Sequence, residues 1–208
     1  MNSELENILE KVATLYMKYG VKSITMDDVA RELGISKKTL YQYVENKNEL
    51  VEKVVDYVIK LKECSFLNIA KKEMNAVEKL LEVNIHIIKE MKDYNPATEY
   101  DLKKYYPESY AKMHSIRKER MYQSILENIK KGKEEGLYRK ELKEEIIARL
   151  QVSRFINMHE DDLFIKKDLE RSEYIHELFI YHIRGIANEK GLEVLEKTLK
   201  IINFNNYL

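Results

Sequence analysis

The sequence predicts an all-α protein of about nine to ten helices, and three observations support this fold class. Glycine and proline, which interrupt helices most often, number only six and two among 208 residues. Apolar residues recur at spacings of three and four along most of the chain, as they do on one face of a helix. Alternating runs typical of strands, internal repeats and low-complexity tracts are all absent from the sequence.

The first expected helix spans residues 3–19. Ser3 and Glu6 have the spacing of a capping box, in which each side chain bonds the backbone N–H of the other residue. Gly20 follows the last apolar position and can end the helix. The inward-facing stripe of this helix consists of Ile8, Val12, Leu15 and Tyr16.

Residues 25–44 are expected to form two short helices joined by a tight turn. Thr25 is a favourable N-cap for the first of them, and Asp28 stands where its capping-box partner belongs. Gly34 can adopt the positive φ that a tight turn requires, and Ser36 can cap the second helix. This order of caps and turn predicts a helix-turn-helix.

The second of these helices, at about residues 37–43, has the character of a recognition helix. Its inward positions are filled by Leu40 together with Val44 or Tyr43. Its outward side chains suit a phosphate or a base edge better than a protein core, and they are Lys37, Lys38, Thr39, Tyr41 and Gln42.

A bridging helix is expected next, beginning at Asn46 and continuing towards Phe66, with Glu49 as the partner of the N-cap. It would connect a DNA-binding head, residues 1–48, to a second helical domain, residues 49–208. The later helices are expected at residues 71–92, 107–134, 142–159, 168–189 and 191–202.

Residues 94–110 contain five of the fifteen tyrosines and both prolines. Pro96 is expected to end the helix at 71–92, because proline cannot continue a helix. Side chains from this region and the helix after it are candidates to line a ligand pocket, although packing is the alternative role. These candidates are Tyr94, Tyr110, Met113 and Arg117. If Arg117 faced inward it would need an anionic partner, such as a ligand carboxylate.

The expected helix at 168–189 carries a broad apolar face near the end of the chain. Its members are Ile175, Leu178, Phe179, His182, Gly185 and Ile186. Gly185 would let a second backbone approach closely, which favours a helix-on-helix dimer interface. Ordinary burial within the monomer is an equally good interpretation, so the pattern leaves both open.

The balance of charge gives no support to nucleic-acid binding. Thirty-six basic residues match 36 acidic ones, so the net formal charge is zero. The first 50 residues hold seven Lys and Arg against eight Asp and Glu. A basic footprint is the usual sign of a nucleic-acid-binding protein. The prediction of DNA binding therefore rests on the geometry of the helix-turn-helix.

Several other classes of protein are disfavoured. The single cysteine, Cys64, excludes an internal disulfide, and no secretion signal or long apolar run is present, so we expect a cytoplasmic protein without a membrane partner. The five histidines show no zinc-ligand spacing, and no catalytic triad or glycine-rich phosphate loop appears. We therefore expect no enzyme activity, no cofactor and no metal site.

The residues around the predicted helix-turn-helix also match a family pattern. In order, they are Gly20, Ile24-Thr25, Val29-Ala30, Leu33-Gly34-Ile35-Ser36, Thr39-Leu40-Tyr41, Tyr43-Val44, Asn46-Lys47 and Glu49-Leu50. With these residues, the first 55 positions closely resemble the head of the tetracycline-repressor (TetR) family of bacterial transcriptional regulators. The rest of the chain resembles the family in helix count and in two short echoes, at residues 133–137 and 183–187.

The resemblance implies a homodimer whose two heads dock in successive major grooves of a palindromic operator in double-stranded DNA. It also implies a helical second domain that binds a small-molecule effector and carries the dimer contacts. We therefore expect a transcriptional regulator, most simply a repressor that its ligand releases from DNA. Two alternatives remain: a ligand-independent regulator or activator of the same fold, and a helical adaptor whose head binds protein.

The resemblance further implies which residues contact DNA. Thr25 would bind a phosphate from the start of its helix, and Lys47 would bind another from the positive end of the bridging helix. Tyr41 would contact a phosphate or a thymine methyl group, with Gln42 and Tyr43 in or beside the groove. The front of the recognition helix would reach base edges and flanking phosphates through Ser36, Lys37, Lys38 and Thr39.

Overall fold

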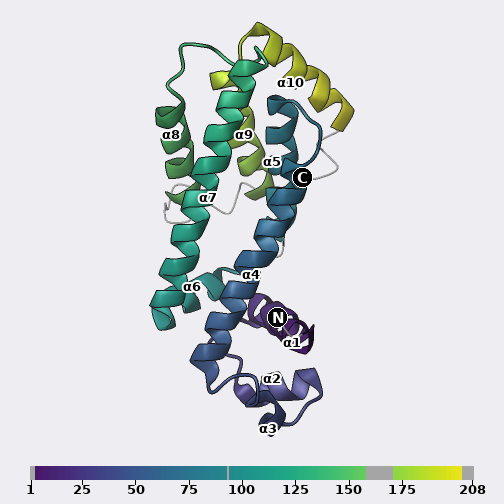
Figure 1. Cartoon of the computed structure of the whole chain (residues 1–208), viewed down its shortest axis with the longest axis vertical. Coiled ribbons are helices and arrows are strands. Elements are labelled where there is room, and N and C mark those ends of the chain that lie inside the picture. The colour runs from purple at the N-terminus through teal and green to yellow at the C-terminus, as the bar shows by residue number, and fades with distance from the viewer. Residues whose placement is uncertain (1–2, 93, 158–170, 203–208) are drawn as a thin grey trace. The chain divides into compact units, whose positions relative to one another are not determined.

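The computed structural model describes residues 3–92, 94–157 and 171–202, and all regular elements in these ranges are α-helices (Figure 1). The all-α prediction is confirmed. The ten helices of the described ranges are α1 (Ser3–Tyr19), α2 (Met26–Leu33), α3 (Lys37–Leu40), α4 (Lys47–Ala70), α5 (Ala76–Lys92), α6 (Pro96–Tyr105), α7 (Pro107–Glu134), α8 (Glu144–Asn157), α9 (Arg171–Ile186) and α10 (Glu189–Ile202).

One helix, α6, was not expected from the sequence. Asn95 is its N-cap, accepting a hydrogen bond from the Ala97 N–H at 2.9 Å, and Pro96 occupies the first turn. A proline that cannot continue one helix is well suited to begin the next, because its missing N–H needs no partner there. The recognition helix is also shorter than expected, since α3 ends at Leu40.

Other expected boundaries differ by a few residues. α8 begins at Glu144 and α9 ends at Ile186, where residues 142 and 189 were expected. Asn188 explains the earlier end, because its side chain accepts from the Gly191 N–H at 3.0 Å at the start of α10. The expected helix ends at residues 158–159 and 168–170 lie outside the described residues.

The chain divides into two compact units, and α4 and α7 each contribute residues to both. The head unit contains Met1–Ser65 and Asp93–Ile116, and the second unit contains Phe66–Lys92 and Arg117–Leu208. These units differ from the expected division at residue 48. The first part of α4 packs into the core of the head, and residues 93–116 return to it.

The core of the head unit joins α1, α2, α3 and the first part of α4. Leu40 of α3 and Leu50 of α4 are completely buried in it. Truncating such a leucine to alanine typically costs about 2–5 kcal/mol of stability. The other buried members are Ile8, Leu9, Val12, Tyr16, Val21, Met26, Val29, Ala30, Val44, Val51, Val54, Val55 and Leu102.

Within the head unit, α6 is attached to the end of α1 and to the link after it. The Thr98 hydroxyl donates to the Tyr16 carbonyl at 2.6 Å, a buried contact. Asp101 accepts from the Lys22 N–H at 2.7 Å, and the Lys22 ammonium lies 3.8 Å from the centre of the Tyr105 ring. These contacts fix the chain that leads into α2.

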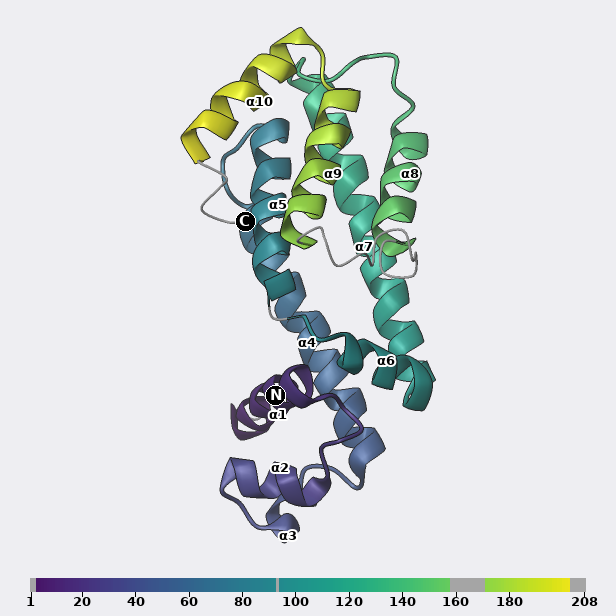
Figure 2. The same cartoon turned by 180° about the vertical axis from the view of Figure 1, so that it is seen from behind.

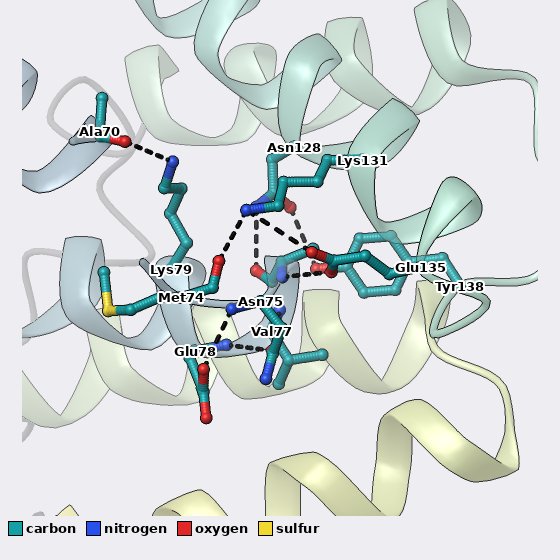
Figure 3. Close-up of polar contacts among 11 residues, drawn as sticks. Ala70, Met74, Asn75, Val77, Glu78, Lys79, Asn128, Lys131, Glu135 and Tyr138 are labelled. Carbon is teal, nitrogen blue, oxygen red and sulfur yellow. Dashed lines mark hydrogen bonds and ion pairs between the residues drawn. The ribbon is translucent and has the colours of Figure 1, made fainter. Parts of the chain in front are cut away.

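The core of the second unit is built on α5 and α9, which lie side by side in both views (Figures 1 and 2). The start of α5 is tied to α7 by a polar network (Figure 3). The Lys131 ammonium donates to the Met74 carbonyl at 2.6 Å, and the Glu135 carboxylate accepts from the Ala76 N–H at 2.8 Å.

Tyr138, which is completely buried, completes this network. Its hydroxyl donates to Asn128 Oδ1 at 3.0 Å, and Asn128 Nδ2 donates to the Ala76 carbonyl at 2.9 Å. The ring of Tyr138 lies directly against Gly132, at a position on α7 where no side chain fits. Gly132 therefore has a packing role.

Gly132→Ala is expected to lower the melting temperature by roughly 3–10 °C, because overpacking costs about 1–3 kcal/mol. The new methyl group would overlap Cδ2 and Cε2 of Tyr138. Gly185→Ala is the matched control on α9, since no described atom lies within 4 Å of its added carbon. Calorimetry of both variants tests this. Equal melting temperatures would contradict the packing role of Gly132.

Candidate nucleic-acid interface

The start of α2 is fixed by the predicted capping box. Thr25 Oγ1 accepts from the Asp28 N–H at 3.1 Å, and the Asp28 carboxylate accepts from the Thr25 N–H at 2.9 Å. The Thr25 hydroxyl also donates to this carboxylate at 2.6 Å, and these hydrogen bonds hold the pKa of Asp28 below its usual value. Thr25 is exposed at a helix N-terminus, a place that favours anions.

The turn between α2 and α3 also has the predicted chemistry. Gly34 has φ 66°, in the left-handed region, and its N–H donates to the Arg31 carbonyl at 3.1 Å. Ser36 then caps α3 by accepting from the Thr39 N–H at 3.0 Å. Leu40, which is completely buried, anchors α3 in the core of the head unit. The C-cap of α2 at Gly34 and the N-cap of α3 at Ser36 fix the turn that leads into α3.

Three predicted contact residues present exposed side chains on and after α3. They are Lys38, Tyr41 and Gln42. Tyr41 keeps 43% of its surface exposed although its neighbour Leu40 has none, so its ring points away from the core. The hydroxyls of Ser36 and Thr39, two further predicted contacts, lie 2.8 Å apart and share a hydrogen bond.

Lys37 was expected to face DNA, and the structure gives it an acidic neighbour. Its ammonium lies 2.9 and 3.0 Å from the two carboxylate oxygens of Asp27 on α2. The hydrogen bond to Asp27 raises the pKa of Lys37, so the amine stays charged. Both side chains are exposed, and an exposed ion pair contributes little to stability. A phosphate can therefore compete with Asp27 for Lys37.

Two other predicted contacts are used partly within the head unit. The Lys47 ammonium donates to the Lys22 carbonyl at 3.1 Å, and burial lowers its pKa against the opposing influence of Asp101 and Asp28. Tyr43 is half-buried against the core of the head unit. The side chains of Lys47 and Tyr43 are thus only partly exposed to solvent. Their contacts with DNA stay predictions.

Three of the four candidate pocket residues belong to the head unit, and Arg117 belongs to the second unit. Tyr94 and Tyr110 both hydrogen-bond to the Glu99 carboxylate, at 2.5 and 3.3 Å. Met113 packs against the core of the head unit, and Arg117 is exposed. The condition for a ligand carboxylate at Arg117, an inward-facing guanidinium, is not met in this structure.

The candidate dimer residues of α9 lie mostly inside their own chain. Ile175, Leu178, Phe179, His182 and Ile186 are buried by other parts of the monomer, and Gly185 is exposed. Sequence reasoning missed a different apolar surface, which we call the α8–α9 face. It consists of the exposed side chains of Ile146, Leu150 and Tyr181. The spacing of four between Ile146 and Leu150 was the available signal.

Comparison with known proteins identifies the family. A family model described as "Bacterial regulatory proteins, tetR family" matches residues 8–54, which span the helix-turn-helix and its supporting helices. The helix-turn-helix head of this chain is thus a head of the tetR family of bacterial regulatory proteins. A curated relative, an uncharacterized HTH-type transcriptional regulator of Bacillus subtilis (strain 168), is 33% identical over 98 residues, or 47% of this chain. The chain spans about half of that relative's length, at 52%.

Solved structures of low sequence identity share the fold of this chain. A transcriptional regulator from Cytophaga hutchinsonii is 17% identical with a TM-score of 0.74, covering 90% of this chain and 100% of that one. A ketosteroid transcriptional regulator of Mycobacterium tuberculosis is also 17% identical, with a TM-score of 0.59 and coverages of 91% and 97%. The expected head and helical second domain are therefore confirmed as a fold.

The described ranges contain neither a membrane-spanning helix nor a cluster of metal-binding side chains. No described helix is long and apolar enough to span a membrane. No group of three or more His, Cys, Asp or Glu side chains among the described residues is arranged to hold a metal ion.

Asp27→Asn is expected to tighten DNA binding by roughly three- to tenfold at low salt, because it releases Lys37 and removes a charge that repels phosphate. The slope of log K against log salt should steepen by up to about 0.9 for each phosphate that Lys37 newly engages. Fluorescence anisotropy with labelled DNA measures both quantities.

Asp56→Asn is the control for this prediction. It makes the same change of charge in another exposed ion pair of the head unit, that of Asp56 with Lys112 at 2.6 Å. A general effect of net charge would strengthen binding equally in the two variants, and that result would rule out a specific role for Asp27.

Proposed function

We propose that this chain is a cytoplasmic, sequence-specific DNA-binding transcriptional regulator, and in particular a repressor that a small molecule releases from a palindromic operator. The observation that carries the proposal is the capped helix-turn-helix. Thr25, Gly34 and Ser36 fix two helices so that Lys38, Tyr41 and Gln42 project outward from a fully buried Leu40. A recognition helix needs this combination of rigid placement and polar outward side chains.

The chemistry of each outward side chain indicates which part of the DNA it would contact. Lys38 is exposed, and no described carboxylate pairs with its ammonium group. Its positive charge is therefore available to a phosphate. The Gln42 carboxamide is able to donate and accept, which suits an adenine edge in the major groove. Lys37 becomes available when a phosphate displaces Asp27. Binding to the operator thus depends on placement more than on net charge, which is zero.

The second unit supports the proposed dimer through the α8–α9 face. Ile146 and Leu150 are 50% and 57% exposed, and Tyr181 is 69% exposed with the Arg154 guanidinium 4.9 Å from its ring centre. Exposed apolar side chains clustered on adjoining helices are typical of a protein interface. A second copy of the same face would give a two-fold symmetric contact, which matches the symmetry of a palindromic operator.

The proposed release mechanism uses α4, which contributes residues to both units. A ligand that prefers one arrangement of the helices of the second unit would shift the equilibrium of α4. Since the first part of α4 belongs to the core of the head, the separation of the two recognition helices would change. Half-sites one turn apart require about 34–36 Å between them, so a change of a few ångströms prevents simultaneous docking.

A salt titration tests the DNA-binding proposal. DNA fragments selected from the source genome by the purified protein are bound at increasing salt, and log K should fall steeply and linearly with log salt. A slope near zero would favour the alternative of a head that binds protein.

Tyr41→Ala should weaken binding to the selected DNA about tenfold, the loss of ~1–2 kcal/mol that one good contact gives. The melting temperature should stay within a few degrees of the wild type because the ring lies outside the core. Tyr100→Ala, which removes a similarly exposed tyrosine from α6, should leave DNA affinity unchanged. Loss of cooperative melting in Tyr41→Ala would reassign its ring to the core.

Ile146→Arg should convert the dimer to a monomer at micromolar concentration, since it places a charge in the middle of an apolar interface. Ile201→Arg makes the same substitution at an exposed position of α10 and should leave the dimer intact. Sedimentation equilibrium measures both. Dimers of equal affinity in the two variants would place the interface elsewhere.

A further inference from the structure

The second unit satisfies some of its buried polar side chains and leaves others without partners. Asn128 uses both ends of its amide, donating to the Ala76 carbonyl and accepting from the Tyr138 hydroxyl (Figure 3). By contrast, Gln151 Oε1 and His182 Nε2 are buried and have no hydrogen-bond partner in the described structure. An unsatisfied buried polar atom destabilises a fold, so each instance requires an explanation.

Gln151 on α8 and His182 on α9 each lie one helical turn from the contact between Phe155 and Phe179. The two helices run in opposite directions in both views (Figures 1 and 2), and the rings of Phe155 and Phe179 meet between them with centroids 5.1 Å apart. Gln151 precedes Phe155 by four residues, and His182 follows Phe179 by three. Each therefore lies one helical turn from the ring pair in the same direction, on the same buried side.

A third unsatisfied atom, Asn84 Oδ1, lies on α5 and belongs to a different contact. The amide nitrogen of Asn84 is 3.0 Å from His176 Nδ1 on α9. His176 is six residues from His182, which places the two imidazoles on different sides of the helix. The pair formed by Gln151 and His182 is thus a separate local arrangement.

The chemistry of this pair defines what it can bind. Burial, together with the charge of Arg154, lowers the pKa of His182 to about 4, so the imidazole is neutral at pH 7. A neutral imidazole and a carboxamide can each donate or accept a hydrogen bond, as a hydroxyl group can. No Lys, Arg, Asp or Glu is among the buried side chains of the described ranges, and Arg154 is exposed beside the Tyr181 ring, so a charged ligand would have no buried counter-ion.

We propose that Gln151 and His182 form the polar end of the effector site and bind the hydroxyl group of an uncharged, otherwise apolar molecule. This inference rests on the proposed function, because it names the class of the effector. The ligand would enter between α8 and α9, with its apolar body beside Phe155 and Phe179. A buried water bridging the two groups is the competing explanation.

The first test is the stability of variants that remove the unsatisfied atoms. Gln151→Met and His182→Leu should each leave the melting temperature unchanged or raise it by about 2–4 °C, since apolar groups of similar size replace orphaned polar atoms. Asn128→Leu is the control, and it should lower the melting temperature because it leaves the Tyr138 hydroxyl unpaired. If all three variants are destabilised alike, Gln151 and His182 are already satisfied, as by a water, and the proposal is wrong.

The second test uses three ligands of one shape: 4-ethylphenol, ethylbenzene and 4-ethylbenzoate. By mass action, 4-ethylphenol at millimolar concentration should raise the melting temperature of the full chain more than ethylbenzene does, and 4-ethylbenzoate should not raise it. In His182→Leu the advantage of the phenol over the hydrocarbon should disappear. Absence of a phenol shift in the wild type, an equal shift in the variant or a shift with the benzoate would each overturn the proposal.

DNA binding of the same proteins separates this inference from the function on which it rests. Without added phenol, the wild type should bind the selected DNA with a steep dependence on salt, because this binding depends on the head unit, to which Gln151 and His182 do not belong. If the wild type shows no salt-dependent binding, the proposed function fails whatever the phenol does. If binding is normal and the phenol has no effect, only the effector inference fails.

Discussion

Leu50, Val51, Val54 and Val55 bury the first part of α4 in the core of the head unit. This burial makes α4 a structural part of the helix-turn-helix, since Leu40 of the recognition helix lies in the same core. Because interiors are close-packed, a movement of α4 cannot be absorbed locally and must be shared by its neighbours. Any signal that reaches α4 is therefore a signal to the recognition helix.

The DNA binding that we propose for the head unit has no net positive charge to support it, since the net charge of the chain is zero. Two acidic residues of the head unit fix local geometry: Asp28 closes the capping box of α2, and Asp101 holds the link before it. Asp27 has a different role, because it neutralises Lys37 on the outward surface. Such a pair reduces attraction to phosphates in general, so binding depends more on contacts that only the correct register provides.

Local chemistry explains which features could be predicted from the sequence. The caps at Thr25 and Ser36 and the turn at Gly34 act over three or four residues, so their spacing alone predicts them. The pairing of Lys37 with Asp27 depends on how two helices lie together, and no spacing rule gives it. The sequence of α9 could not show whether its broad apolar face is covered by its own chain or by a second copy. Burial in a monomer core and burial in a dimer interface require the same apolar side chains.

The effector site and the dimer contact that we propose share the same two helices at neighbouring positions. Leu150 is 57% exposed and Gln151 only 2%, and Tyr181 is 69% exposed beside His182 at 7%. Successive residues of a helix point about 100° apart, so each helix presents one residue outward and the next inward. A ligand that separates Gln151 from His182 must therefore move Leu150 relative to Tyr181. Effector binding would then alter the dimer surface itself, besides any effect carried through α4.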